Sequence, residues 1–348
     1  MKYKNKMVIV ALCTICGDLL TQSSGFALPP DPDNAAFLYY QAFSLYEKPD
    51  KELVVDIAEG NINPDEMMIK RIELCRPAIE MASDAAKLVK CNWGLKYSDG
   101  LDMQVRYPGE AKRLVYTILA DARIALIESN YSLAVQRYIT ARSMAVHVGQ
   151  DPLNVGLIVE KTLEKVTNKC IQDFLSYETY DASLLLNLKT QLNGLENQKK
   201  PIEFYLEAEH EILKMYFSPK KIQEVLTWVD EGDKSCDSAR ELILNADETF
   251  IQENESYNNK YWSEVFVALK QPYRLAYEKI SELKDSYQKV DCKDNPAVTL
   301  TKNFTPPVHR IYNRVIQSDT FSNAILTALE LYIIGNQTGK LPDSLPEG

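Results

Sequence analysis

Glycine and histidine are both scarce in this chain. Of its 348 residues, 13 are Gly and three are His. Low Gly content, long amphipathic runs and few clusters of β-branched residues together favour a chain that is almost entirely helical. The Glu207-x-x-His210 spacing of di-iron bundles occurs here, but such a site needs the motif twice and two further Glu. The sequence therefore predicts no metal site and no cofactor.

The sequence also lacks the short motifs that indicate a reaction. It has no G-x-S-x-G, no H-E-x-x-H and no G-x-x-x-x-G-K-[ST]. No nucleophile elbow, zincin helix or phosphate-binding loop is predicted, and no catalytic residue can be named. Paired carboxylates that meet only in the folded chain leave no such motif. A secreted α/α-type hydrolase with an acidic cleft therefore stays open as an alternative.

Positive charge is in short supply. The formal net charge is −10, and basic residues adjoin one another only in short stretches such as "NQKKP" and "SPKKI". A chain this acidic is a poor candidate for binding nucleic acid, because the phosphates would be repelled. Downstream of the first segment, no apolar run reaches the roughly 20 residues that cross a bilayer, so no membrane span is expected in the mature chain.

The first 27 residues have the three parts of an export signal. The opening "MKYKNK" is positively charged, Met7–Leu20 is largely apolar, and small residues stand at the two positions that a signal peptidase needs small, ending at Ala27. We therefore expect a signal peptide over 1–27, cleavage near Ala27, and a mature chain in the periplasm or outside the cell. A single membrane anchor is the alternative, for which the apolar run is short.

Cysteine usage leaves two possibilities open. Two of the seven Cys lie in the predicted signal segment, and no C-x-x-C remains after cleavage, which argues against a zinc ribbon or a thioredoxin-type site. An oxidising compartment permits up to two disulfides among the other five, but their wide spacing does not give the pairing. Buried free thiols are the alternative. The five are Cys75, Cys91, Cys170, Cys236 and Cys292.

The stretch from Ala111 to Val148 carries two matching apolar stripes joined by the polar turn "ESNYS". Apolar residues recur at helical spacing on both sides of the turn, and Gly149 can end the second helix. Two such helices bury their stripes by packing antiparallel. The structural residues of this hairpin are predicted to be Ala122, Tyr131, Ala134, Tyr138 and Ala141.

This hairpin resembles one unit of a tetratricopeptide-type repeat. In that repeat a small residue lets paired helices approach, and an aromatic residue fills the groove beside it. Ala134 and Tyr138 match that pattern, and Ala122 stands where the first helix has its small residue. The pattern departs at Asp121, where a large apolar residue is expected, and at Pro152, which comes too late. No second copy follows at a period of about 34 residues, so the resemblance covers one partial repeat.

A wider resemblance covers roughly the first 190 residues and the last 40. The segments "PDPDNAAFLYYQAF" and "CNWGLKYSDG", the hairpin and the closing "GKLPDSL" are together similar to exported helical proteins of unassigned function from planctomycete-type bacteria. That resemblance implies an exported helical protein and no particular activity.

The predicted fold is all-α, an irregular stack of antiparallel helix pairs in a tetratricopeptide-like α-α superhelix. The signal peptide covers 1–27 and the helical-repeat-like domain 28–290. The stretch 291–307, with three Pro, is predicted as a linker. C-terminal helices and a tail follow over 308–348.

The passage from Cys91 to Gly100 is the richest in aromatic and acidic residues outside the predicted helices. Trp93, Tyr97 and Asp99 are candidates to line a ligand groove, with Trp93 filling the core beneath a loop as the alternative. Stacked helical hairpins offer partners a large surface without any reactive group. We expect an exported, non-catalytic interaction or scaffold protein that presents a helical groove to a protein or cell-envelope partner.

Overall fold

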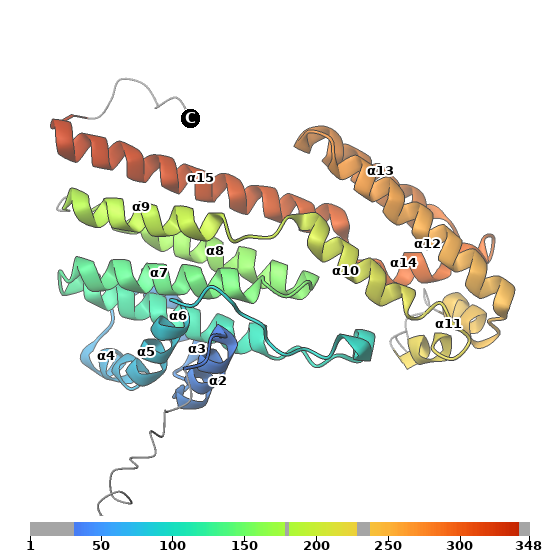
Figure 1. The fold of residues 1–348 in the computed structure, drawn as a ribbon, viewed down its shortest axis with the longest axis horizontal. Coiled ribbons are helices and arrows are strands. Elements are labelled where there is room, and N and C mark those ends of the chain that lie inside the picture. The colour runs from blue at the N-terminus through green and yellow to red at the C-terminus, as the bar shows by residue number, and fades with distance from the viewer. Residues whose placement is uncertain (1–30, 178–180, 228–236, 341–348) are drawn as a thin grey trace, which may run out of the picture. The chain divides into compact units, whose positions relative to one another are not determined.

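A computed structural model describes residues 31–177, 181–227 and 237–340 of the chain. All regular elements in these ranges are helical and comprise 14 α-helices and three 3₁₀ turns (Figure 1). The helices belong to one compact unit that begins at Asn34. The prediction of an all-α stack of helix pairs is confirmed.

Four short helices open the unit, and side-chain caps explain where three of them begin. Asn34, Asp50 and Asp65 each accept a backbone N–H of the first turn, at distances between 2.8 and 3.2 Å. Pro77 lies in the first turn of the fourth helix, where its missing N–H would have no helical partner in any case. The four are α2 (Ala35–Leu45), α3 (Lys51–Ala58), α4 (Glu66–Glu73) and α5 (Arg76–Ala85).

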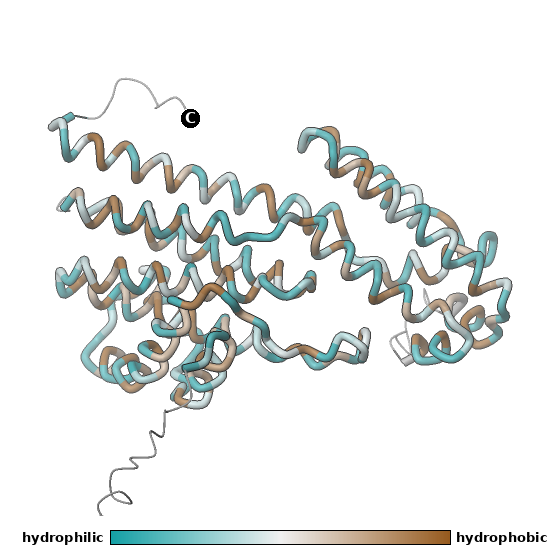
Figure 2. Tube along the Cα trace, in the orientation of Figure 1, coloured by the Kyte–Doolittle hydropathy of each residue, from teal (hydrophilic) through white to brown (hydrophobic). Residues whose placement is uncertain are grey.

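Two helical hairpins form the centre of the unit. Consecutive helices reverse direction across short turns, so the second helix of each hairpin runs the same way, and these two lie side by side (Figure 1). Apolar residues recur along the central helices, with polar residues between them (Figure 2). This amphipathic pattern lets each helix bury one side against its neighbours. The hairpins are α6 (Tyr107–Ile127) with α7 (Tyr131–Val148), and α8 (Asn154–Phe174) with α9 (Ala182–Glu196).

The first hairpin buries the residues that its stripes predict. Ala122, Ala134 and Ala141 are each 0% exposed and Tyr138 is 1% exposed, whereas the half-buried Tyr131 packs its ring against Phe174. The three alanines are thus enclosed in the core, and the rings of Tyr131 and Tyr138 pack against Phe174 of α8.

The departure at Asp121 also has a physical reason. Its carboxylate is 2% exposed and accepts a hydrogen bond from Arg137 Nε at 2.7 Å. Arg137 also pairs with Glu80 of α5, at 2.6 Å. An ion pair thus joins α6, α7 and α5 at the position where the repeat pattern calls for an apolar residue.

The following helices build two further apolar clusters, one around Tyr205, Trp262 and Ile280, all 0% exposed, and one around Tyr216, Ile222 and Ile243. They are packed largely on one another, with α10 also reaching α8. The helices are α10 (Ile202–Lys214), the 3₁₀ turn η2 (Ile222–Thr227), α11 (Asp237–Leu244), α12 (Glu248–Leu269) and α13 (Tyr273–Lys289).

The stretch 291–307, predicted as a linker, is partly helical. It contains the 3₁₀ turn η3 (Pro296–Val298) and α14 (Thr299–Phe304). Asn254 of α12 holds both, because its buried amide donates to Pro296 O at 3.1 Å and accepts the Leu300 N–H at 3.0 Å. This long-range clamp ties the predicted linker to α12.

The last helix, α15 (Val308–Thr338), returns to the two hairpins and packs along α8 and α9. Ile325, Leu329 and Ile333 recur every four residues on its buried side and join the same apolar core as α6 and α7. The predicted C-terminal segment is therefore part of the same packed unit.

The described cysteines, Cys75, Cys91, Cys170 and Cys292, are buried with free thiols. Cys236, the predicted signal peptide and the tail from 341 lie outside the described residues. Within the part of the chain that the structure describes, no helix combines the length and the hydropathy needed to cross a membrane.

Candidate binding groove over α7

Trp93, predicted as a groove residue, lies in the core. Its side chain is 3% exposed, its ring stacks on Tyr107 with centroids 4.2 Å apart, and Tyr39 stacks nearby at 5.5 Å. The indole N–H donates to the backbone oxygen of His147 at 2.9 Å. With its rings and its donor occupied, Trp93 fills the core beneath the loop, which is the alternative that the sequence left open.

Tyr97 and Asp99 lie at the surface of the same loop. The Tyr97 hydroxyl donates to Asp151 Oδ1 at 2.9 Å and so fastens the loop to the turn between α7 and α8. Asp99 pairs with Lys96, three residues earlier. Trp93, Tyr97 and Asp99 line neither of the two cavities described below. A ligand role for Tyr97 or Asp99 stays a prediction.

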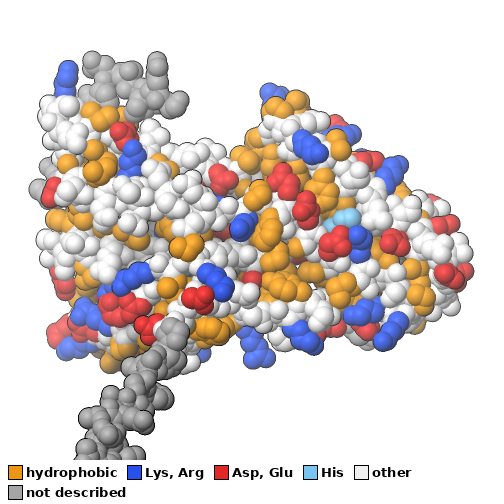
Figure 3. Space-filling model, viewed as in Figure 1, with side chains coloured by type: hydrophobic (Ala, Val, Ile, Leu, Met, Phe, Trp, Pro, Cys, Tyr) orange, Lys and Arg blue, Asp and Glu red, His pale blue; other side chains and the backbone are white. Residues whose placement is uncertain are grey.

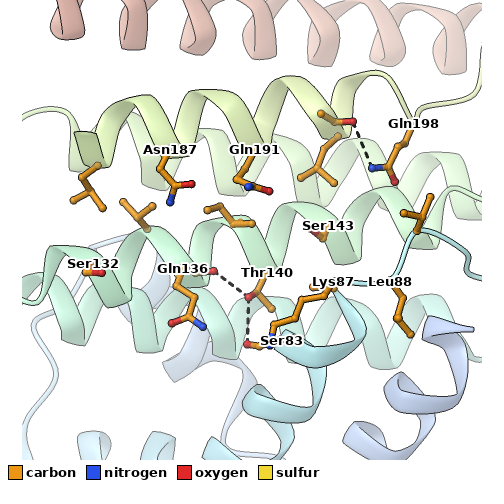
Figure 4. Close-up of a pocket in the computed structure, with 17 residues that line it drawn as sticks. Ser83, Lys87, Leu88, Ser132, Gln136, Thr140, Ser143, Asn187, Gln191 and Gln198 are labelled. Atoms are coloured by element: carbon orange, nitrogen blue, oxygen red, sulfur yellow. Dashed lines mark hydrogen bonds between the residues drawn. The ribbon is translucent and has the colours of Figure 1, made fainter. Parts of the chain in front are cut away.

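A groove runs over α7, bounded by α9 on one side and by the end of α5 on the other (Figure 4). Its volume is about 410 Å³, and we refer to it as the α7 groove. On the α7 side its polar residues recur four or three positions apart, which places them on one face of the helix. They are Ser132, Gln136, Thr140 and Ser143.

The α9 side presents amides. Asn187 and Gln191 point from α9 toward α7 (Figure 4), and both are exposed. Among the described residues, the side chains of Asn187, Gln191 and Gln136 have no hydrogen-bond partner. Gln198 follows at the end of the row, and its buried Oε1 likewise has no partner in the described structure. Four amides around the groove thus keep free donor or acceptor capacity.

The floor of the groove is apolar and tightly packed. Val135 is 1% exposed and Leu195 is 7% exposed, and both line the groove between the two polar rows. On the α5 side, Thr140 Oγ1 lies 3.2 Å from Ser83 Oγ and donates to Gln136 O, so these hydroxyls already have partners. The groove therefore combines an apolar floor with polar edges.

The walls of the groove carry almost no charge. Lys87 is the one charged residue among those that line it, and it pairs with Asp84 at 2.7 Å. The space-filling view shows a largely white surface over α7 and α9, with charged side chains gathered below it (Figure 3). In a chain of net charge −10, this is a neutral surface.

Next to the groove, α7 is tied to α8, α9 and α15 by buried charges. We define this ionic network as Arg142, Glu160, Lys161, Glu164, Glu196, Lys199 and Asp319.

Arg142 is the centre of the ionic network. It is 1% exposed, and its guanidinium pairs with Glu164 of α8 and Glu196 at the end of α9. Lys199 pairs with the same two carboxylates and lies 2.7 Å from Glu164. These ion pairs join α7 and α8 to the end of α9, next to the α7 groove.

Lys161 extends the network to α15. Its Nζ lies 3.1 Å from both Glu160 Oε1 and Asp319 Oδ1. Burial raises the pKa of Glu160 and lowers the pKa of Arg142. For Glu196 burial acts to raise the pKa, but the neighbouring cations, Arg142 first, leave it below its usual value. The charges are held in the interior by one another.

An α/α-type hydrolase would need carboxylates in an open cleft. Burial raises the pKa of Asp151, Glu160 and Glu209, but these acids bond inside the fold, as when Glu209 accepts the Asn154 N–H at 3.1 Å. None of the three acids lines the α7 groove. Across the described ranges, no group of three or more His, Cys, Asp or Glu is placed to hold a metal ion.

Sequence reasoning missed the α7 groove, although part of its signal was readable. The row from Ser132 to Ser143 and the row from Asn187 to Gln198 each recur at helical spacing. Such rows are also typical of solvated helix faces, and only the fold brings α9 alongside α7.

Comparison with known proteins adds no relative, because no protein-family model, no curated protein and no solved structure matches the chain. The likeness of the hairpin to a tetratricopeptide-type repeat, and of the chain to exported helical proteins, stays a prediction.

Proposed function

We propose that this chain is an exported, non-catalytic interaction protein whose α7 groove binds an extended segment of a protein or cell-envelope partner. The observation that carries the proposal is the set of unpartnered amides of Gln136, Asn187 and Gln191 around an apolar floor. A primary amide both donates and accepts hydrogen bonds, so it can pair with the N–H and C=O groups of a peptide backbone.

The length of the groove suits a short peptide. The rows Ser132–Ser143 and Asn187–Gln198 each cover 11 residue steps along helices that run the same way. At a rise of about 1.5 Å per residue, each row is roughly 16 Å long. An extended strand rises about 3.3 Å per residue, so about five residues of a partner would lie along the groove.

The lining also suggests which peptides fit. Because the walls are neutral, hydrogen bonds to the backbone and apolar contacts with Val135 and Leu195 would supply the affinity. Charged side chains gain no ionic partner there. The expected ligand is a neutral segment with small or apolar side chains.

Different observations support the proposed export and the proposed absence of catalysis. Export is supported by the charged, apolar and small-residue pattern of residues 1–27. A binding role without chemistry is supported by the groove walls, whose single titratable side chain, Lys87, is already paired. A cation held by a neighbouring carboxylate is a poor nucleophile or base.

Peptide selection tests the proposal. Displayed heptapeptides are selected for binding to the purified protein. The dissociation constants of the selected peptides are then measured by calorimetry for wild type and for Gly194→Leu. Gly194 lines the groove, and a Cβ added there meets nothing within 4 Å, so the new side chain enters the groove without straining α9. We expect at least a tenfold loss of affinity.

Gly109→Leu is the matched control. Gly109 is also helical and its Cβ position is also open, but it lies outside the α7 groove. Its peptide affinity should equal that of wild type, and raising the salt from about 50 to 500 mM should change neither value much. Peptides that bind Gly194→Leu as tightly as wild type would refute a role for the groove.

A further inference from the structure

A second cavity, of about 370 Å³, lies between the start of α3 and the start of α6; we refer to it as the α3–α6 pocket. Its volume falls within the range of about 300–1,000 Å³ that is usual for small-molecule sites. Its walls differ in kind from those of the α7 groove.

The floor of the α3–α6 pocket is apolar. Val54 is 2% exposed and lines it together with Val55 and the rings of Tyr46 and Tyr116. The Tyr46 hydroxyl is hydrogen-bonded to Thr117 Oγ1 at 2.7 Å, so it turns its polar end away from a ligand. Such a floor favours hydrocarbon, which leaves water on binding.

Four cations stand around this floor. Arg113 lies 3.0 Å from Glu110, and Lys48 lies 3.9 Å from the same side chain. The other two, Lys51 and Lys112, have no acidic partner among the described residues. Positive charge is therefore left over at the rim of the pocket.

The nearby acids do not cancel this surplus. Besides Glu110, the Asp50 carboxylate lies next to Lys51 in the chain, where it accepts the Leu53 N–H at 2.9 Å as the cap of α3. Four cations thus line the pocket, and none of the carboxylates close to them in the chain, Glu47, Asp50, Glu52 and Glu110, is among its lining residues. In a chain of net charge −10, such a basic rim is a local exception.

The backbone adds two features at the same rim. Lys48 has a φ of 48°, a conformation that residues with a side chain seldom adopt and that clusters at ligand sites. Gly109 lies in the first turn of α6, a helix whose N-terminus has no side-chain cap. The unpaired N–H groups of such a turn favour a negative charge nearby.

We infer that the α3–α6 pocket binds an amphipathic anion, a hydrocarbon chain that ends in a carboxylate or a phosphate. The chain lies on the floor of Val54, Tyr46 and Tyr116, and the charged end meets Lys51, Lys112 and the start of α6. Neither the hydrocarbon chain nor the charged end should bind tightly alone, because the floor offers no charge and the cations are exposed to solvent. This inference does not depend on peptide binding in the α7 groove.

Decanoate is the probe. Calorimetry on the purified protein should show binding at one site. Decanamide, with the same chain and no charge, and acetate or inorganic phosphate, with charge and no chain, should each bind at least tenfold more weakly. Comparison with decyl phosphate shows whether the pocket prefers a carboxylate or a phosphate as the charged end of its ligand. Tighter binding of decanoate supports a free carboxylate ligand, and tighter binding of decyl phosphate supports a phosphate-headed one.

Two variants locate the site. Gly109→Leu places a side chain in the pocket where a Cβ meets nothing within 4 Å, and should weaken decanoate binding at least tenfold. Gly194→Leu, the blocker of the α7 groove, should leave it unchanged. A thermal melt equal to that of wild type shows that Gly109→Leu is folded.

Charge variants test the rim. Lys112→Gln should weaken decanoate binding about three- to tenfold. Lys260→Gln changes an exposed lysine of α12 outside the pocket and should have no effect. Equal binding of decanamide and decanoate, or full decanoate affinity in folded Gly109→Leu, would overturn the inference.

Discussion

The α7 groove and the α3–α6 pocket have similar volumes, about 410 and 370 Å³, but opposite chemistry. Amides and hydroxyls edge the first, with one paired lysine. Cations surround the second, over an apolar floor. The two cavities therefore cannot be told apart by volume. Their lining residues differ, and they suit the α7 groove to a peptide backbone and the α3–α6 pocket to a charged small molecule.

The two sites also differ in what holds their walls. The α7 groove borders the ionic network, in which Arg142 joins α7 to the end of α9. The α3–α6 pocket rests on apolar packing and on the Tyr46–Thr117 hydrogen bond. Loss of buried charge should therefore damage the groove and spare the pocket.

The largest effect is expected from Arg142→Met. The change removes the cation between Glu164, 0% exposed, and Glu196, and leaves both carboxylates with less compensation. Breaking a buried ion pair by removing one partner costs about 3–5 kcal/mol. Urea unfolding should show a loss of that size, and the protein that stays folded should lose peptide affinity but keep decanoate affinity.

Arg274→Met is the control for that experiment. Arg274 pairs with Glu278 at 3.0 Å, but its side chain is 87% exposed. An exposed pair of this kind contributes about 0–1 kcal/mol. Equal stability of the two variants would show that the ionic network does not hold the groove.

The aromatic cluster around Trp93 belongs to neither site. His147 lies next to this cluster and should make the stability of the fold depend on pH. Burial of His147 lowers its pKa to about 4, with a hydrogen bond to the Leu88 backbone opposing. The unfolded value is about 6.5, so as the pH falls the unfolded chain binds this proton first. The contribution of His147 is complete above pH 6.5 and is lost towards pH 4, by about 3 kcal/mol in all.

NMR gives the readout for His147 in the folded protein. Its ring signals should stay unchanged from pH 7.5 to pH 5. A titration midpoint near 6.5 would mean that the ring is hydrated and that the aromatic cluster is open, as a binding site would require.

Ala134→Leu probes the helix contact behind the α7 groove. Ala134 is 0% exposed, so the larger side chain overpacks the core and should cost about 1–3 kcal/mol. Gln136→Leu, an exposed change two residues further on, should alter stability by no more than about 0.5 kcal/mol. An unchanged melting temperature for Ala134→Leu would mean that no helix packs closely there.

The smallest effects are expected from the groove amides. Asn187→Ala and Gln191→Ala should each weaken peptide binding by about 0.5–1.5 kcal/mol, the net value of one hydrogen bond. Decanoate binding should not change in either variant. If both kept full peptide affinity, calorimetry would assign recognition to the apolar floor and not to the amides.

Local sequence signals predicted the helices and the hairpin well. Periodicity located Ala134 and Tyr138 on a buried face. The ionic network could not be foreseen, because the partners of Arg142 are distant in the sequence. Its partners Glu196 and Ser322 come from α9 and α15, 54 and 180 residues later.

The sequence also could not decide between the two readings of Trp93, a groove residue and a residue that fills the core. Aromatic and acidic residues in a loop are compatible with a ligand site and with a core contact. The difference depends on Tyr39 and Tyr107, which reach the indole from α2 and α6. Sequence spacing does not show that these rings pack on the indole, whereas the burial of Trp93 in the folded chain does.

Photo-crosslinking at two positions of α9 tests the central claim most directly. Benzoylphenylalanine is placed at Gln191, in the α7 groove, or at Leu186, which is 52% exposed and does not line it. Each protein is irradiated with a selected peptide, and the adducts are mapped by mass spectrometry. Adducts are expected from position 191 and none from position 186. Adducts from 186, with none from 191, would contradict the claim.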